Sequence, residues 1–345
     1  ATIRETFRQR IYNNNSDKTR LISGHSIRNL LKAAAVRFER GVNESIDPDT
    51  GLLHTYYFHK PIAAMQTDSE HVNIDSFQAR PLPLFLEGQV HWLRVCDSQQ
   101  ARKIYQTLRR SRLLDPQLQM YKLNECLAEC SPVIGRARTF SRGWFENESI
   151  WLHMSYKYLL ELLKQGLYEE FYADAQTMLV PFMDPAVYGR SILENSSFIA
   201  SSVCPDPQAR GRGFVARLSG STAEFIHIWL HLTVGPRPFR IHKGRLIFAP
   251  APALPGAWFT EKTSVIHWNE QSVEISENTF TCALLGRILL VYHNPARKDT
   301  FGLAALRPRA YQIDNGPEIP AIELAGQIAE QIRQQKVGRI DIHLR

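Results

Sequence analysis

The first two thirds of the chain carry apolar residues at helical spacing. In the stretch 144–166, Ile150, Trp151, Met154 and Tyr158 fall on one face of a helix, and Gly166 follows where a helix can end. A stripe of this kind must pack against another element. Similar patterns predict helices over residues 17–40, 84–95, 100–113, 144–166, 167–181 and 221–233.

The pattern changes after Pro236. Short alternating or β-branched blocks follow, separated by glycine, proline and asparagine, and they predict strands and hairpins. A last helix is expected over Ile319–Lys336. Paired helices joined by short loops favour a mainly α fold with a C-terminal β element, an (α/α)6 toroid or part of one. The predicted domains are 1–235, a helical-pair portion of the barrel, and 236–345, a β-rich element with one helix.

The stretch Gly211–Trp229 is typical of a tight loop that leads into a helix. Ser221 and Glu224 have the spacing of a capping box, so this helix is predicted to begin at or just before Ser221. It is apolar over most of its surface, which predicts a buried position. Its N-terminus offers N–H groups and the positive end of the helix dipole, which suit a phosphate or a sugar hydroxyl. An ordinary capped helix after a glycine-rich turn is the alternative. The candidate phosphate-binding residues are Ser219, Gly220, Ser221 and Thr222.

Two polar segments are candidates for a sugar-binding site. In the first, carboxylates stand among aromatic residues, a combination that suits pyranose rings and their hydroxyls, although acidic residues at a helix start also complement the dipole. The second segment combines arginine, glutamate and asparagine between two apolar helices. The candidate substrate-binding residues are Trp144, Glu146, Asn147, Glu148, Arg190, Glu194 and Asn195.

These two segments are expected to meet. A toroid gathers such segments at one end, so we expect Glu146, Glu148, Arg190 and Glu194 to face one shared cavity. The alternative is that Arg190 pairs with Asp184 or Glu194 and only holds its own loop.

Composition and charge narrow the class of ligand. The 345-residue chain has a hydrophobic content of 44%, a charged content of 22% and a net charge of +7, with arginines spread along it. This balance permits an anionic ligand such as phosphate and does not argue for nucleic acid. Five cysteines without a paired framework indicate reduced thiols, and the chain is expected to be cytoplasmic or a piece of a longer protein. Neither a metal site nor an apolar run of membrane length is expected.

Four motifs in one order resemble the C-terminal part of the cellobiose phosphorylase family and its longer relatives that act on β-glucans. They are GWFENESIWLHMSYKYLLELL, DPAVYGRSILENSSFIASS, GFVARLSGSTAEF and LIFAPAPALPGAWF, and the resemblance spans roughly residues 17–343. It implies a β-sandwich, an (α/α)6 barrel that holds the active site, and a C-terminal β element. The implied reaction is inverting phosphorolysis of β-glucosides, with inorganic phosphate as co-substrate and no other cofactor.

The resemblance also implies roles for particular residues. Ser219 and Gly220 fall where the family has a Thr-Gly pair that binds phosphate. The family usually carries a phosphate-binding His at positions that correspond to about Asn147–Ser149. Here the only nearby His is His153, one to two turns later.

The general acid of the family is an aspartate in a motif upstream of the segment that matches RLISGHSIRNLLKAA, so it is expected to lie before Ala1. The catalytic residue within this chain is then unknown, with Glu87 and Glu146 as the candidates that might substitute. The expected partners are a β-linked gluco-oligosaccharide and the N-terminal half of the same protein or a partner chain, with no nucleic acid and no membrane. The alternative is a non-catalytic glucan-binding or structural subunit.

Overall fold

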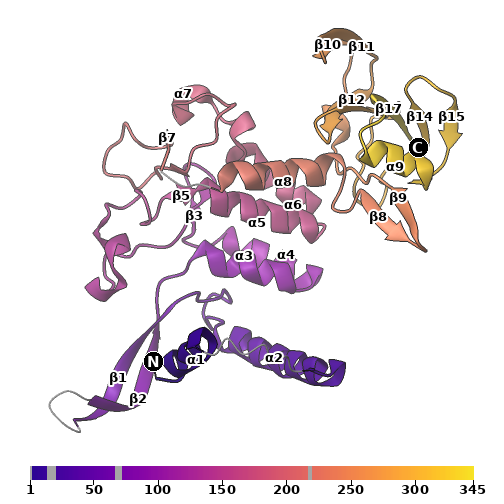
Figure 1. The fold of residues 1–345 in the computed structure, drawn as a ribbon. Coiled ribbons are helices and arrows are strands. Elements are labelled where there is room, and N and C mark those ends of the chain that lie inside the picture. The colour runs from indigo at the N-terminus through magenta and orange to yellow at the C-terminus, as the bar shows by residue number, and fades with distance from the viewer. Residues whose placement is uncertain (1, 14–20, 67–71, 217–219) are drawn as a thin grey trace. The chain divides into compact units, whose positions relative to one another are not determined.

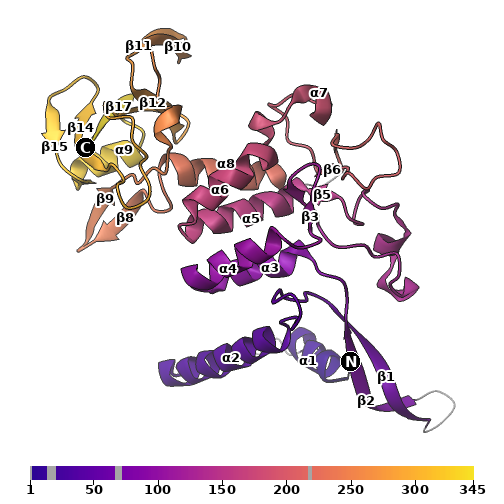
Figure 2. The same cartoon turned by 180° about the vertical axis from the view of Figure 1, so that it is seen from behind.

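A computed structural model describes residues 2–13, 21–66, 72–216 and 220–345. The chain divides into two compact units, Ala1–Ile46 and Asp47–Arg345. Figures 1 and 2 show the elements of both units from opposite sides. Among the described residues, no helix is both long enough and apolar enough to cross a bilayer.

The first unit contains two helices, α1 (Thr2–Asn13) and α2 (Gly24–Glu44). Ser23 caps α2, because its Oγ accepts a hydrogen bond of 3.1 Å from the backbone N–H of Ser26. No side chain of α2 is buried, so the apolar stripe that predicts this helix is exposed. Its large exposed members are Ile27, Leu30, Leu31, Val36 and Phe38.

The helices of the second unit are α3 (Leu86–Val95), α4 (Ser98–Leu108), α5 (Leu152–Lys164), α6 (Tyr168–Met178), α7 (Pro185–Tyr188) and α8 (Ser221–Thr233). Helix α5 packs against α3, α6 and α8, and α4 packs against α3 (Figure 1). The apolar face of α5 explains its central place, because Tyr156, Tyr158, Leu159 and Leu162 are fully buried.

Helix α8 begins at Ser221, as the sequence predicts, but it is not buried all round. Ile228 and Leu232 are buried, whereas Ile226, Trp229 and Leu230 on the same helix are exposed. The prediction of a helix enclosed on every side is therefore wrong, because α5 covers one face of α8 and the other faces solvent.

The C-terminal half of the second unit is built on a mixed sheet. Its strands lie in the order β12 (Thr279–Leu284), β13 (Ile288–His293), β17 (Arg339–Leu344), β14 (Pro308–Ile313) and β15 (Glu318–Pro320). Strands β13 and β17 are parallel, and the other pairs are antiparallel. A second sheet has the order β16 (Leu324–Ala325), β9 (Arg245–Phe248) and β8 (Phe239–His242), and α9 (Gln327–Arg333) packs against β9 and β16.

One hydrophobic core joins these two sheets and α9. Its fully buried members come from both sheets and from the helix, so the elements fold as one packed layer system. They include Phe248, Leu290, Tyr311, Ile332 and Ile340.

The remaining described strands form small ladders. They are β1 (Tyr57–Gln66) with β2 (Val72–Pro81), β10 (Ser264–Trp268) with β11 (Gln271–Ile275), β3 (Leu114–Asp115) with β4 (Met120–Tyr121), and β5 (Ile150–Trp151) with β6 (Phe198–Ile199) and β7 (Gly213–Phe214). Short 3-10 helices cover Pro132–Ile134, Arg136–Thr139, Val180–Phe182 and Gly256–Trp258.

The expectation of a mainly α fold, and of an (α/α)6 toroid or part of one, is wrong. The protein is 35% helical and 24% strand, with several sheets that include the five-stranded mixed sheet. Residues 57–66 and 72–81 pair as the antiparallel strands β1 and β2, where the sequence analysis predicts no strand. The helix expected over Ile319–Lys336 is confined to Gln327–Arg333, because its first residues extend as β15 and β16.

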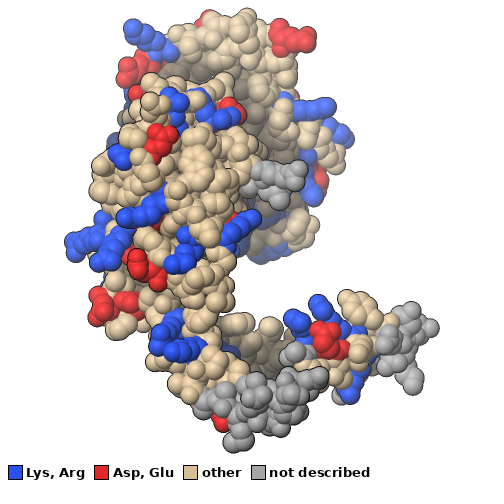
Figure 3. Space-filling view, turned by 90° about the vertical axis from the view of Figure 1, so that its left-hand side faces the viewer, with Lys and Arg blue, Asp and Glu red and all other residues tan. Residues whose placement is uncertain are grey.

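Basic side chains outnumber acidic ones on the face drawn in Figure 3, in keeping with the net charge of +7. Such an excess attracts small anions over distances up to about the Debye length, about 8 Å at physiological salt.

Candidate functional site

The N-terminus of α8 lies against the first turn of α5. The N-cap of α8 is Gly220, with no side-chain cap hydrogen bond. A Cβ atom added at Gly220 would lie 2.9 Å from Cδ2 and 3.0 Å from Nε2 of the His153 imidazole. Only a glycine leaves room for the ring at this distance, so the imidazole and the positive end of the α8 dipole meet at one point. We call His153, Gly220, Thr222 and Glu224 the His153 site.

His153 lies closer to the start of its helix than the sequence predicts. The predicted helix began at Trp144, but α5 begins at Leu152, so His153 lies in its first turn. Phe145 and Glu148 have positive φ values of 47° and 59°, which exclude a helix there, and Ile150–Trp151 forms β5. The pairing of Ile150–Trp151 with Phe198–Ile199 sets this later start, and two residues are too few to show a strand period in the sequence.

The electrostatics of the His153 site favour a neutral imidazole. The pKa of His153 is lowered, mainly by burial and further by the Lys157 ammonium. Glu224 and Glu87 act in the opposite direction but do not cancel this effect. Nε2 of His153 lies 3.8 Å from Oε1 of Glu224. A neutral imidazole can donate one N–H to an anion, and an anion bound beside it would favour the protonated form.

The helix start differs in detail from a capping box. Ser221 is the first residue of α8, and its hydroxyl donates to the carbonyl oxygen of Ser196 at 3.1 Å. Thr222 is exposed at the same end of the helix. Ser219, the remaining predicted phosphate-binding residue, lies outside the described residues.

Glu87, one of the two candidate acids, lies in the first turn of α3. The Tyr56 hydroxyl donates a short hydrogen bond to Glu87, and Oε1 of Glu87 lies 3.8 Å from Nε2 of His91. Burial, followed by the Glu87 carboxylate, raises the pKa of Tyr56 to about 12, so this phenol stays protonated and keeps donating. Glu87 also acts electrostatically on His153.

Glu148 is a buried carboxylate with two cationic partners, of which Lys122 is buried and Arg142 is exposed. It accepts a hydrogen bond of 2.9 Å from Lys122 Nζ and two hydrogen bonds from the Arg142 guanidinium. Burial alone would raise the pKa of Glu148, but these hydrogen bonds outweigh burial and lower it. The carboxylate is therefore ionised at neutral pH, and we call Lys122, Arg142 and Glu148 the Glu148 triad.

The neighbours of Glu148 mainly hold their own loop. Glu146 accepts two hydrogen bonds from Arg136, at 2.7 and 3.2 Å. The side chain of Asn147 is buried and bonds to the backbone of Leu127 and Phe140. The ring of Trp144 packs edge-on against those of Phe145, Phe198 and Phe214.

The second polar segment closes on itself. Arg190 pairs with Glu194, which is one of the alternatives that the sequence left open, while Asp184 caps α7. Asn195 Oδ1 accepts a hydrogen bond of 2.8 Å from the hydroxyl of Tyr156. A cavity shared by Glu146, Glu148, Arg190 and Glu194 stays a prediction.

No family model matches this chain, and no curated protein matches it.

Proposed function

We propose that this chain is part of a carbohydrate-active enzyme that cleaves β-glucosides by inverting phosphorolysis, with phosphate bound at the His153 site. The observation that carries this proposal is the contact of the His153 ring with Gly220 at the N-terminus of α8. The His153 site and the four sequence motifs support this proposal. The proposal does not require an (α/α)6 barrel, because the same reaction can occur on unrelated folds.

The chemistry at this site follows from its donors. The first-turn amides of Thr222 and Ala223 have no carbonyl partner within α8, and they lie at the positive end of its dipole. His153 adds an imidazole N–H. Together these groups suit the oxygens of a phosphate dianion, and the absence of a Cβ on Gly220 lets the imidazole lie close to this helix end.

In the proposed reaction, a phosphate oxygen forms a bond to the anomeric carbon while the bond from that carbon to the glycosidic oxygen breaks. A carboxylic acid gives its proton to the departing oxygen. The two candidate acids in this chain are Glu146, which accepts two hydrogen bonds from Arg136, and Glu87, which accepts one from the Tyr56 hydroxyl. The five free thiols fit the cytoplasmic location that we include in this proposal.

The first prediction concerns Gly220. Replacing Gly220 with valine is expected to weaken phosphate binding by about tenfold or more, because the new Cβ must displace His153, and several charge-assisted hydrogen bonds depend on this approach. Calorimetric titration with phosphate measures the change. Gly41→Val is the matched control, because a Cβ at Gly41 meets no atom within 4 Å. Equal phosphate affinity in wild type and Gly220→Val would refute the phosphate site.

Turnover separates the enzyme from a binding subunit. Cello-oligosaccharides and phosphate are incubated with the protein, and glucose 1-phosphate is measured. Phosphate-dependent release that falls in Gly220→Val supports phosphorolysis. Phosphate binding without any release favours the glucan-binding subunit, and release of glucose without phosphate indicates hydrolysis.

The second prediction concerns pH. Sulfate keeps the same charge between about pH 5 and 8, so a change in its affinity reports on the protein. Because the pKa of His153 is lowered in the free protein, the ring gains a proton only in acid, and sulfate affinity is expected to rise as the pH falls. One added charge-assisted hydrogen bond predicts a rise of about tenfold. His153→Gln should bind sulfate with an affinity that is independent of pH in this range, and a pH dependence identical to wild type would exclude His153 as the sensor.

A further inference from the structure

A large cavity lies apart from the His153 site, and it is lined by residues from the turn that follows α4, the β3–β4 segment and the loop that carries Glu148. Its volume is about 640 Å³, within the range of about 300–1,000 Å³ that is common for small-molecule sites. We call it the arginine cavity. Its lining residues are distinct from those of the His153 site, so it needs an explanation of its own.

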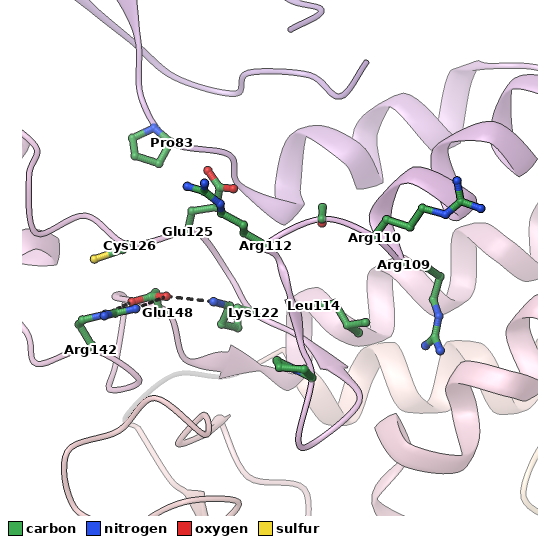
Figure 4. A pocket seen from close by; sticks show the side chains of 12 residues that line it. Pro83, Arg109, Arg110, Arg112, Leu114, Lys122, Glu125, Cys126, Arg142 and Glu148 are labelled. Atoms are coloured by element: carbon green, nitrogen blue, oxygen red, sulfur yellow. Dashed lines mark hydrogen bonds and ion pairs between the residues drawn. The ribbon is translucent and has the colours of Figure 1, made fainter. Parts of the chain in front are cut away.

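The lining of the arginine cavity is strongly basic. Arg109, Arg110, Arg112, Lys122 and Arg142 face it, together with the two carboxylates Glu125 and Glu148, which leaves an excess of three positive charges. In Figure 4, Arg109 and Arg110 lie at one end, Arg142 and Cys126 lie at the other, and Arg112 and Glu125 lie between them. Cations spread along a cavity of this size suit an anion that is itself extended or multiply charged.

Two of these cations are held in place from behind. Lys122 is largely buried and forms an ion pair with the buried Glu148 carboxylate. The Arg142 guanidinium forms a second ion pair with the same carboxylate. Arg109 donates to Asp174 at 3.1 Å and to Gln119 at 3.2 Å. Asp174 is fully buried and accepts a further hydrogen bond from Tyr158 at 2.9 Å. Such support orders the cationic groups before a ligand arrives, which lowers the entropic cost of binding.

The side chains also indicate the class of ligand. A guanidinium matches two phosphoryl oxygens at once, and three arginines within Arg109–Arg112 supply several such forks. The other described lining residues are Pro83, Ser111, Leu114, Pro116 and Cys126, which offer no aromatic face on which a nucleobase could stack. These features favour a compact polyanion over a nucleotide.

We propose that the arginine cavity binds a small molecule that carries several phosphoryl groups, a second anion site separate from the one at His153. A short inorganic polyphosphate and a sugar bisphosphate share this chemistry. In either case Arg110 and Arg112, which are exposed, close on the ligand over the ordered Lys122 and Arg109.

The test is calorimetric titration at physiological salt with two probes, tripolyphosphate and glucose 1,6-bisphosphate. The variant Arg110→Ala/Arg112→Ala is expected to bind the probe about tenfold more weakly or worse, because it loses two charge-assisted contacts. Both residues are exposed, so the variant should fold, which its unfolding curve checks. Lys103→Ala is the control, because Lys103 is an exposed cation on α4 that does not line the cavity; it should bind within about twofold of wild type.

The outcomes separate the two proposals. If tripolyphosphate binds more tightly than the bisphosphate, the ligand is a polyphosphate, and the reverse order indicates a phosphorylated sugar; both results support the site. If wild type binds neither probe, or the double variant binds as wild type does, the site is refuted. If His153→Gln abolishes probe binding, the anion occupies the His153 site and the second site is refuted. Retention of probe binding in His153→Gln, together with unchanged sulfate affinity, would refute the phosphate site alone.

Discussion

Glu148→Gln is expected to destabilise the protein by about 3–5 kcal/mol at neutral pH, because it leaves the buried Lys122 ammonium without its carboxylate. Glutamine has nearly the same shape, so the loss reports charge rather than volume. Urea unfolding followed by circular dichroism measures the free energy of unfolding. Because the pKa of Glu148 is lowered by folding, its contribution is present above the unfolded-state pKa. The difference between variant and wild type should therefore shrink as the pH falls through the folded-state pKa.

Glu146→Gln is the matched control for this experiment. It lies two residues away in the same loop, but its partner Arg136 has a side chain that is 77% exposed. Exposed ion pairs contribute about 0–1 kcal/mol, so Glu146→Gln should change stability little. The double variant Lys122→Met/Glu148→Gln should recover part of the loss, because it removes the unpaired ammonium. Equal effects of Glu146→Gln and Glu148→Gln would contradict a buried ion pair of Lys122 and Glu148.

Phe248→Ala is expected to cost about 3–5 kcal/mol, because it empties a fully buried position in the core that joins the two C-terminal sheets and α9. Ile241→Ala, on the neighbouring strand β8, removes an exposed side chain and should cost less than about 1 kcal/mol. Chemical unfolding of the two variants compares a core position with a surface position of one hairpin. If the two losses are similar, the three-stranded sheet does not share the core of the five-stranded sheet.

The sequence locates those elements whose packing is local and periodic. The start of α8 at Ser221 is confirmed, and α3 and α5 occupy stretches predicted to be helical. In these segments one apolar face meets one neighbour, so the spacing of apolar residues carries the needed information.

Other features depend on partners that are far away in the sequence. The pairing of β5 with β6 joins Ile150 to Ile199, and two residues are too few to show a strand period. That pairing moves the start of α5 and brings His153 to Gly220. The predicted toroid failed for a related reason: helix pairing is visible in a sequence, whereas the ladder between β1 and β2 and the mixed sheet depend on which segments meet.

The site predictions show the same limit. Gly220 could be singled out because a glycine before a capped helix has a local meaning. The roles of Glu146 and Glu148 could not be separated, since both stand among the same aromatic residues. Only the fold distinguishes them, by placing Lys122 beside Glu148 and the exposed Arg136 beside Glu146.

The place of β17 in the five-stranded sheet also affects how the protein forms during synthesis. β17 follows the other four strands along the chain, yet it lies between β13 and β14 and pairs with both. While a ribosome is still holding Arg339–Leu344, the nascent chain has two separate hairpins with open edges. Until β17 is available, the apolar faces of these hairpins stay uncovered, and their unpaired edges can pair with strands of other chains. Completion of the five-stranded sheet is therefore a step that follows translation of β17.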